Sequence, residues 1–168
     1  MSAAAIESTG GGKPPVAKID PRSAAAIATL LPAAQRAARA LLAAANDGRL
    51  GAGIVVKIIC GTRTYAEQTA LYAQGRTAPG PIVTDAPAGY SNHNFGIAFD
   101  VGIFNGGVYL EDSPLYAKVG ALGCVQGLTW GGDWPSFPDE PHFQLPWGGS
   151  LAEARALVAE GEWKERWS

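Results

Sequence analysis

The sequence predicts an α+β fold in which a small, mainly antiparallel sheet is flanked by helices. Two observations predict it. An alanine-rich stretch with helical spacing comes first, and short β-branched or aromatic segments then alternate with loops rich in glycine and proline, without an internal repeat. The length of 168 residues suits one domain with a core large enough to fold without disulfides.

The first expected helical region runs from Ser23 to Ala45, where twelve of 23 residues are alanine. Apolar residues recur there at spacings of three and four, so one face is expected to be buried. Pro32 divides the stretch and suits the first position of a second helix. The segment 46–48, Asn-Asp-Gly, marks the expected end of that helix.

A strand, a helix and a long loop are expected next. The nearly continuous β-branched run Ile54–Cys60 predicts a buried strand. Thr64 and Glu67 have the spacing of a capping box, which predicts a helix that reaches about Gln74 and is closed by the following glycine. Residues 76–90 lack periodicity and predict a loop, which at this length in a small domain is typically functional or mobile.

The second half of the chain supplies the rest of the sheet. Ile97–Ile103 is expected to be the second strand, and Asn105-Gly106-Gly107 predicts a tight turn into a short strand over 108–110. Pattern and capping residues predict the remaining elements: a helix over 113–122, strands over 128–130 and 142–145, and a helix over 150–160.

Composition excludes several classes of protein. Thirteen Lys and Arg against 15 Asp and Glu give a formal net charge of −2. Nucleic-acid-binding proteins normally have a strong basic excess, so nucleic acid is not an expected partner. The opening residues show no signal-peptide pattern and no apolar stretch is long enough to span a bilayer, so we expect a soluble protein made in the cytoplasm, without membrane insertion. Cys60 and Cys124 are expected to be free, buried thiols, with a disulfide as the alternative.

Both histidines of the chain lie close to carboxylates. His93 comes shortly before the second strand, and a bend at Gly96 can bring its ring towards Asp100. By the two-residue alternation of a strand, Asp100 faces away from the apolar residues of that strand and lies between Ala98 and Gly102. Such small neighbours leave room beside the carboxylate for an ion or a substrate.

The second histidine, His142, follows two adjacent carboxylates, Asp139 and Glu140. Two imidazoles and one carboxylate give three N/O ligands, and with a fourth position for water this is the donor set of a catalytic zinc site. Zinc lowers the pKa of water towards ~7, and a nearby carboxylate can accept the proton. The alternative is that each histidine forms an ordinary pair at the surface or in the core, and spacing alone does not decide between the two.

The motifs resemble those of a known group of enzymes. Ser91-x-His93-x-x-Gly96-x-Ala98-x-Asp100, followed by Asp139-x-x-His142, resembles the zinc peptidases of the hedgehog/DD-peptidase superfamily. The chain is most similar there to endolysin-like L-alanyl-D-glutamate endopeptidases and their D-alanyl-D-alanine carboxypeptidase relatives. Segments at 61–68, 71–76 and 130–134 support the resemblance, which covers residues 23–145.

The resemblance implies one zinc ion with His93, Asp100 and His142 as its ligands. It also implies that Asp139 is the general base. On a regular strand Glu140 would share a face with His142 and Asp139 would not, but the segment between Pro138 and Pro141 need not be regular. Spacing therefore leaves both carboxylates open, and the resemblance favours Asp139. Manganese or cobalt can replace zinc in such a donor set.

Two further residues match positions of the family. Arg63 matches the arginine that polarises the scissile carbonyl and stabilises the oxyanion, a role suited to a permanently charged fork. Ser91 matches a serine that lies near the substrate in some relatives.

The resemblance implies a monomeric enzyme that hydrolyses peptidoglycan stem peptides, at the L-alanyl-D-glutamate bond, with metal-activated water and a carboxylate base. The alternatives are a D-alanyl-D-alanine carboxypeptidase or dipeptidase and a non-catalytic, zinc-stabilised module that binds cell wall. The expected organisation is an N-terminal arm over 1–22 and one peptidase domain over 23–168, with its motifs at 54–145. The enzyme would act on the cell wall, in the periplasm or outside the cell, after release by lysis or another export route; phage lysis and wall remodelling both remain open.

Overall fold

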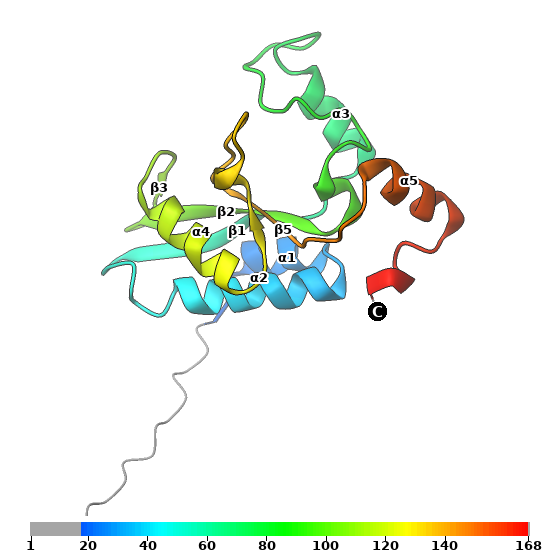
Figure 1. The fold of residues 1–168 in the computed structure, drawn as a ribbon. Helices are drawn as coiled ribbons and strands as arrows, with labels where there is room; N and C mark the ends of the chain where they lie inside the picture. The colour runs from blue at the N-terminus through cyan, green and yellow to red at the C-terminus, as the bar shows by residue number, and fades with distance from the viewer. Residues whose placement is uncertain (1–17, 168) are drawn as a thin grey trace, which may run out of the picture.

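Two N-terminal helices support one face of the sheet (Figure 1). The structure is a computed structural model that describes residues 18–167. Helix α1 (Pro21–Ala28) begins at an Asp20 N-cap, two residues before the expected start, and α2 (Pro32–Ala45) has Pro32 at its first turn as predicted. The expected arm over 1–22 lies mostly outside the described residues.

The sheet has five strands, and every pairing is antiparallel. The spatial order is β1-β2-β5-β4, and β3 pairs with β2 beyond the part of β2 that pairs with β5. The bounds of the strands are β1 Ile54–Cys60, β2 Ala98–Asn105, β3 Val108–Leu110, β4 Thr129–Trp130 and β5 His142–Gln144. The predicted α+β class and the antiparallel sheet are therefore confirmed.

Strand β1 is buried on one face only. Val56 and Ile58 are buried against the helices, whereas Val55 is 43% exposed. The apolar run of the sequence suggested burial on both faces. The difference arises because α1 and α2 both pack on the face of β1 that carries Val56 and Ile58.

The helix that begins at Leu115 has Pro114 as its N-cap and not, as expected, as its first residue, whereas the other two remaining helices begin at the expected capping residues. Helix α3 (Tyr65–Ala73) and helix α5 (Leu151–Glu160) both open with a complete capping box, from Thr64 and Ser150. Helix α4 (Leu115–Val125) runs three residues past its expected end. Short 3-10 turns occupy η1 (Asn92–Phe95), η2 (Gly131–Asp133) and η3 (Glu165–Trp167).

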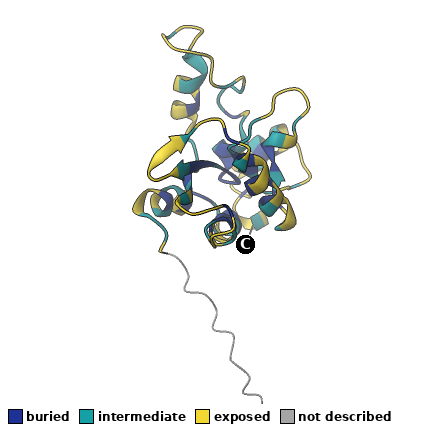
Figure 2. Ribbon diagram, turned by 90° about the vertical axis from the view of Figure 1, so that its left-hand side faces the viewer, coloured by how far each residue is buried: buried dark blue, intermediate teal, exposed yellow. Residues whose placement is uncertain are grey.

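The main core fills the space between α1, α2, α4 and the inward face of the sheet. A second, smaller cluster under α5 contains Phe95, Ile97, Ala154 and Trp163. Figure 2 shows the buried residues concentrated in the central strands, while α3 and the loop that follows it are largely exposed. Both cysteines are free, as expected, but Cys124 is exposed and Cys60 is half-buried.

No helix within residues 18–167 combines the length and the hydropathy that crossing a bilayer requires.

Candidate active site

The face of the sheet opposite α1 and α2 carries polar side chains from two neighbouring strands. Asp100 of β2 pairs directly with His142 of β5, and residues paired in this way project from the same face. Their neighbours in the strands, Phe99 and Phe143, are fully buried in the main core. Because successive side chains alternate, Asp100 and His142 point away from that core.

The 3-10 turn η1 carries His93 to the same place. The Ser91 hydroxyl accepts a hydrogen bond from the His93 backbone N–H and caps the turn, which ends at Gly96 with φ +71°. This left-handed conformation favours glycine and produces the predicted bend. As a result, His93 Nε2 lies 3.0 Å from Asp100 Oδ1.

Three atoms that can coordinate a metal ion form a small triangle at this point. His93 Nε2 lies 3.2 Å from His142 Nδ1, which lies 3.4 Å from Asp100 Oδ1. Ligands held 2.0–2.2 Å from a tetrahedral zinc ion are about 3.3 Å apart. The structure thus brings together the three residues that the sequence proposed as ligands, at separations that fit one such ion.

The charges of the site favour a cation between these groups. Burial disfavours the charged form of His93, but the negative charge of Asp100 and its hydrogen bond outweigh burial and raise the pKa of His93. Burial likewise favours a neutral Asp100, yet the charge of His93 and the hydrogen bonds from both imidazoles hold the pKa of Asp100 well below its usual range. A metal ion between the two imidazoles and Asp100 would balance the negative charge of this carboxylate in the same way.

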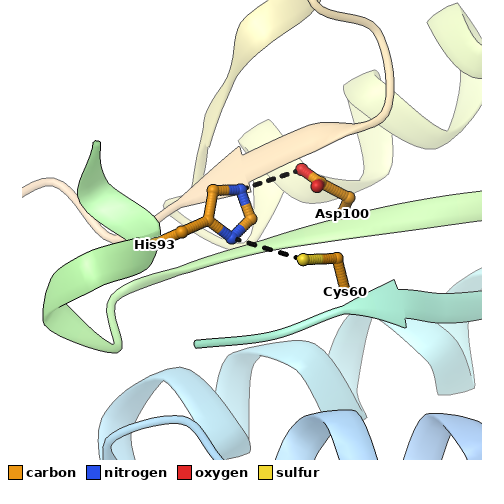
Figure 3. Close-up of side chains that lie close together, drawn as sticks. All are labelled: Cys60, His93 and Asp100. Atoms are coloured by element: carbon orange, nitrogen blue, oxygen red, sulfur yellow. Dashed lines mark hydrogen bonds and ion pairs between the residues drawn. The ribbon is translucent and has the colours of Figure 1, made fainter. Parts of the chain in front are cut away.

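Cys60 forms a second possible ligand group with His93 and Asp100 (Figure 3). Its thiol lies 3.9 Å from His93 Nδ1, on the far side of the ring from Asp100. The same Nδ1 lies 2.8 Å from the carbonyl oxygen of Gly61, which can only accept a hydrogen bond. Nδ1 therefore carries a proton, and a metal would take the place of the proton on Nε2, the nitrogen that faces Asp100 and His142. The chemistry favours the two histidines and Asp100 over the group with Cys60.

Arg63 lies at the edge of the triangle. Its Nη2 donates to Asp100 Oδ2 over 3.2 Å, and its Nη1 donates to the Gln68 amide oxygen over 2.9 Å. The backbone of Arg63 is also fixed, because its N–H donates to the His93 carbonyl and its own carbonyl accepts from the Asn94 amide. These contacts orient the guanidinium towards the site.

A cleft of about 600 Å³ opens over the triangle. Arg63 and Ser91 both line it, and Trp134 forms part of the wall, its ring centroid 4.9 Å from that of His142. Within the described part of the chain, the lining residues include Asp139 and exclude Glu140, whose carbonyl accepts from Trp130 Nε1. Burial raises the pKa of the Asp139 carboxyl, and the charge of Asp100 raises it further.

Gly131 determines the position of Asp139. Its carbonyl accepts the Asp139 N–H over 3.0 Å, and the Asp139 carbonyl accepts the His142 N–H over 3.1 Å. A Cβ on Gly131 would lie 2.5 Å from the Asp139 carbonyl oxygen and 3.0 Å from His142 Cβ. Only glycine permits this close approach, which turns the Asp139 side chain into the cleft.

Sequence reasoning missed several polar residues that contact the site. Gln144 Oε1 lies 3.0 Å from His142 Nε2 and accepts from the Asn92 amide over 2.7 Å. Gln68 is fully buried, although helix spacing alone does not indicate this. One signal was available: Gln144 follows His142 by two positions, so on a strand it shares the face of that histidine. The expected open space beside Gly102 was wrong, because Ile59, Phe104 and Tyr109 cover it.

Comparison with known proteins assigns the family. The sequence profile described as D-alanyl-D-alanine carboxypeptidase matches residues 84–145. The peptidoglycan L-alanyl-D-glutamate endopeptidase CwlK of Bacillus subtilis (strain 168) is 39% identical over 126 residues, which cover 69% of this chain and 73% of CwlK. The chain belongs to this family of carboxypeptidases and endopeptidases. Membership confirms the family predicted from the motifs and the enzyme class, a metal-dependent hydrolase of peptide bonds.

A solved structure of this peptidase family has the same fold. The crystal structure of the L-Ala D-Glu endopeptidase ChiX of Serratia marcescens matches with a TM-score of 0.57 at 23% identity. The match covers 75% of this chain and 87% of ChiX. The likeness supports the α+β fold.

Proposed function

We propose that this protein is a zinc peptidase that hydrolyses the L-alanyl-D-glutamate bond of peptidoglycan stem peptides. One observation carries the proposal: a triangle of ligand atoms, the half-buried carboxylate of Asp139 and the guanidinium of Arg63 line a single cleft. CwlK, whose name states this activity, matches 69% of the chain.

In this proposal His93, Asp100 and His142 hold one zinc ion. When bound, the ion would act as a Lewis acid that lowers the pKa of water and polarises a carbonyl. Each imidazole presents one nitrogen to the triangle, and Asp100 presents Oδ1 while its Oδ2 accepts from Arg63. The chain thus supplies a charged ligand and two neutral ones and leaves the cleft side open.

Asp139 is proposed as the general base. Its burial and the nearby Asp100 raise its pKa, which makes the carboxylate a better proton acceptor than an exposed aspartate. It accepts a proton from the attacking water and delivers it to the amine that leaves. Asp139 lines the cleft and Glu140 does not, which supports this assignment over the neighbouring carboxylate.

Arg63 is proposed to stabilise the negative charge that develops on the scissile carbonyl oxygen. Gln68 and Asp100 hold its guanidinium in place before substrate arrives, so little reorganisation is needed during the reaction. Ser91 is proposed to contact the substrate from the same wall of the cleft. The proposal extends to one peptidase domain over 23–168, acting as a monomer on the cell wall after release by lysis or another export route.

Mass spectrometry of purified muropeptides tests the function. We expect the protein to sever the bond between L-Ala and D-Glu, and we expect a zinc chelator to abolish the cleavage and added zinc to restore it. Release of a terminal D-Ala would instead identify a D,D-carboxypeptidase, the activity named by the matching family profile. Binding of zinc and cell wall without any cleavage would identify a binding module and overturn the proposal.

A further inference from the structure

The two histidines of the triangle are oriented by different kinds of partner. A neutral imidazole has one N–H and one nitrogen with a free lone pair, and only the second can bind a metal. His93 donates Nδ1–H to the Gly61 carbonyl, a backbone group that cannot donate in return. Its tautomer is therefore fixed by the fold itself.

His142 is oriented by a side-chain amide instead. Its Nδ1 faces His93 Nε2 and Asp100, and its Nε2 lies 3.0 Å from Gln144 Oε1. Without a metal, Nδ1 donates to Asp100, so it can bind a metal only after losing that proton, when the neutral ring carries its proton on Nε2 and donates it to Gln144. An amide has a donor end and an acceptor end, so Gln144 supports this tautomer in one of its two orientations only.

Asn92 is the other partner of that amide. Its Nδ2 donates to Gln144 Oε1 over 2.7 Å, while its Oδ1 is buried and has no hydrogen-bond partner among residues 18–167. If both amides turned over, Gln144 would donate to Asn92 Oδ1 and to His142 Nε2. The number of hydrogen bonds would be unchanged, but the proton of His142 would move to Nδ1 and point into the triangle.

We propose that Gln144 and Asn92 form an amide pair that sets the tautomer of His142 and thereby the metal affinity of the site. Both are positioning residues, since they act through the ring of a ligand. The inference rests on the proposed zinc site. Partners of this kind typically change metal affinity by about 10–100-fold when they are replaced.

Two substitutions that preserve side-chain size and add one negative charge separate this role from an effect of charge alone or of packing alone. Gln144→Glu places an acceptor-only carboxylate beside His142 Nε2–H and the Asn92 amide, and it locks the metal-binding tautomer. Asn92→Asp places the same charge one residue away in the pair, and it forces Gln144 to donate towards both neighbours. We expect Q144E to bind zinc at least as tightly as the wild type and N92D to bind it about 10–100-fold more weakly.

The measurement is competition for zinc against a chromogenic chelator, with the full chain and with thermal unfolding as a check of folding. Tighter binding in both variants would mean that added charge alone matters, and weaker binding in both would mean that only packing matters; either result overturns the proposal. Asn92→Ala, which adds no charge, is expected to fall between the wild type and N92D and replaces N92D if that variant does not fold.

A second readout keeps this proposal separate from the zinc site itself. Long-range ¹H–¹⁵N spectra of the full chain without zinc report which nitrogen of His142 carries the proton. We expect the proton on Nε2 in Q144E and on Nδ1 in N92D. The same tautomer in both variants would overturn the amide pair, whereas failure of the wild type to bind zinc would overturn the proposed function alone.

Discussion

The two walls of the cleft are held in place by different kinds of contact. The loop wall, residues 76–91, is fixed by side chains from other elements: Gln68 donates to the Ala86 carbonyl over 2.7 Å, and Asn94 accepts from the Gly89 N–H over 3.0 Å. The strand wall, residues 131–141, is the segment that connects strands β4 and β5, and it is fixed by backbone hydrogen bonds around Gly131. One substitution can remove a single side-chain hydrogen bond of the loop wall. The backbone hydrogen bonds of the strand wall depend instead on Gly131 having no Cβ.

The division follows the chemistry of the site. The strand wall carries Asp139 and leads directly into the ligand His142, so its atoms must be placed to within a fraction of an ångström. The loop wall carries Ser91 and apolar residues such as Val83 and Tyr90, which line the cleft without reaching the ligand triangle. Positions that contact substrate tolerate more movement than positions that transfer a proton.

The largest effect is expected from the carboxylate of the strand wall. Asp139→Asn removes the proton acceptor without changing its size, so we expect kcat to fall by about 10²–10⁴-fold while zinc remains bound. The measurement is the rate of muropeptide cleavage together with the zinc content of the purified variant. Glu140→Gln is the matched control and should leave the rate unchanged. Full activity in the first variant with loss in the second would reverse the assignment of the base.

Gly131→Ala tests the backbone of the same wall. The added Cβ overlaps the Asp139 carbonyl and approaches His142, so we expect about 1–3 kcal/mol of destabilisation and about a 10²-fold fall in kcat. Denaturant unfolding and cleavage rates measure the two effects. Gly148→Ala is the control, because Gly148 has φ +75° with open space around it and should lose stability by about 1 kcal/mol with no change in kcat. Equal kcat in both variants would show that the close approach does not position the base.

Gln68 tests the loop wall, where one buried amide connects Arg63 to Ala86. Gln68→Leu leaves the guanidinium and the carbonyl without this partner, and we expect a loss of about 1–3 kcal/mol of stability and a smaller fall in kcat than in Gly131→Ala. Gln68→Glu keeps the acceptor for Arg63 but cannot donate to Ala86. Hydrogen exchange at residues 84–90 should therefore increase in both variants, while kcat should be better preserved in Gln68→Glu. Unchanged exchange in both would show that Gln68 does not hold the loop.

A weaker contact comes from helix α5. Arg155 donates to the Gly89 carbonyl over 2.9 Å, and its guanidinium lies 4.1 Å from the centroid of the Tyr90 ring. Arg155→Ala should cost about 1 kcal/mol, with little change in kcat, because the site is reached only through the loop. Thermal unfolding and steady-state rates provide the measurement. A loss of kcat as large as that of Gln68→Leu would mean that α5 takes part in positioning the site.

The smallest effect concerns the capping boxes of α3 and α5, which flank the loop wall. Hydrogen bonds from Thr64 and Ser150 lower the pKa values of Glu67 and Glu153 below the ordinary glutamate value of 4.5. A lowered pKa means that the stabilisation is complete above the unfolded value and declines as the pH falls through the folded value. E67Q and E153Q should therefore flatten the loss of thermal stability below about pH 4.5. If thermal stability below about pH 4.5 fell as steeply in both variants as in the wild type, the two glutamates would not stabilise the helices through their capping boxes.

Much of the fold follows from local signals in the sequence. Pro32 and the two capping boxes mark helix starts, and Gly96 marks the bend that brings His93 to Asp100. These signals are reliable because each rests on a backbone requirement within a few residues. The proximity of His93, Asp100 and His142 followed from the resemblance of their motifs to a known family, whereas their spacing alone left ordinary histidine–carboxylate pairs as an alternative.

The side-chain partners of the site were less predictable. By alternation from Val56 and Ile58, Cys60 would face the core. A β-bulge between Ile58 and Cys60 shifts the register, so Cys60 pairs with Asp100 and lies on the cleft side, near Arg63. A bulge depends on tertiary packing, and no residue type in the β1 segment indicates it. For the same reason the contacts of Gln68 with a loop sixteen or more positions away were not visible in the sequence.

The turn between α1 and α2 supports the backbone segments that orient His93. The Leu31 N–H donates to the Gly96 carbonyl over 2.9 Å, and the Gly61 backbone packs directly against the Ala26 carbonyl and the Thr29 hydroxyl. Gly61 and Gly96 in turn orient His93. The helical pair therefore helps to position the proposed metal ligands, although the residues that line the cleft include none from α1 or α2. A graft of the active-site motifs onto another scaffold must carry residues 21–45 with them.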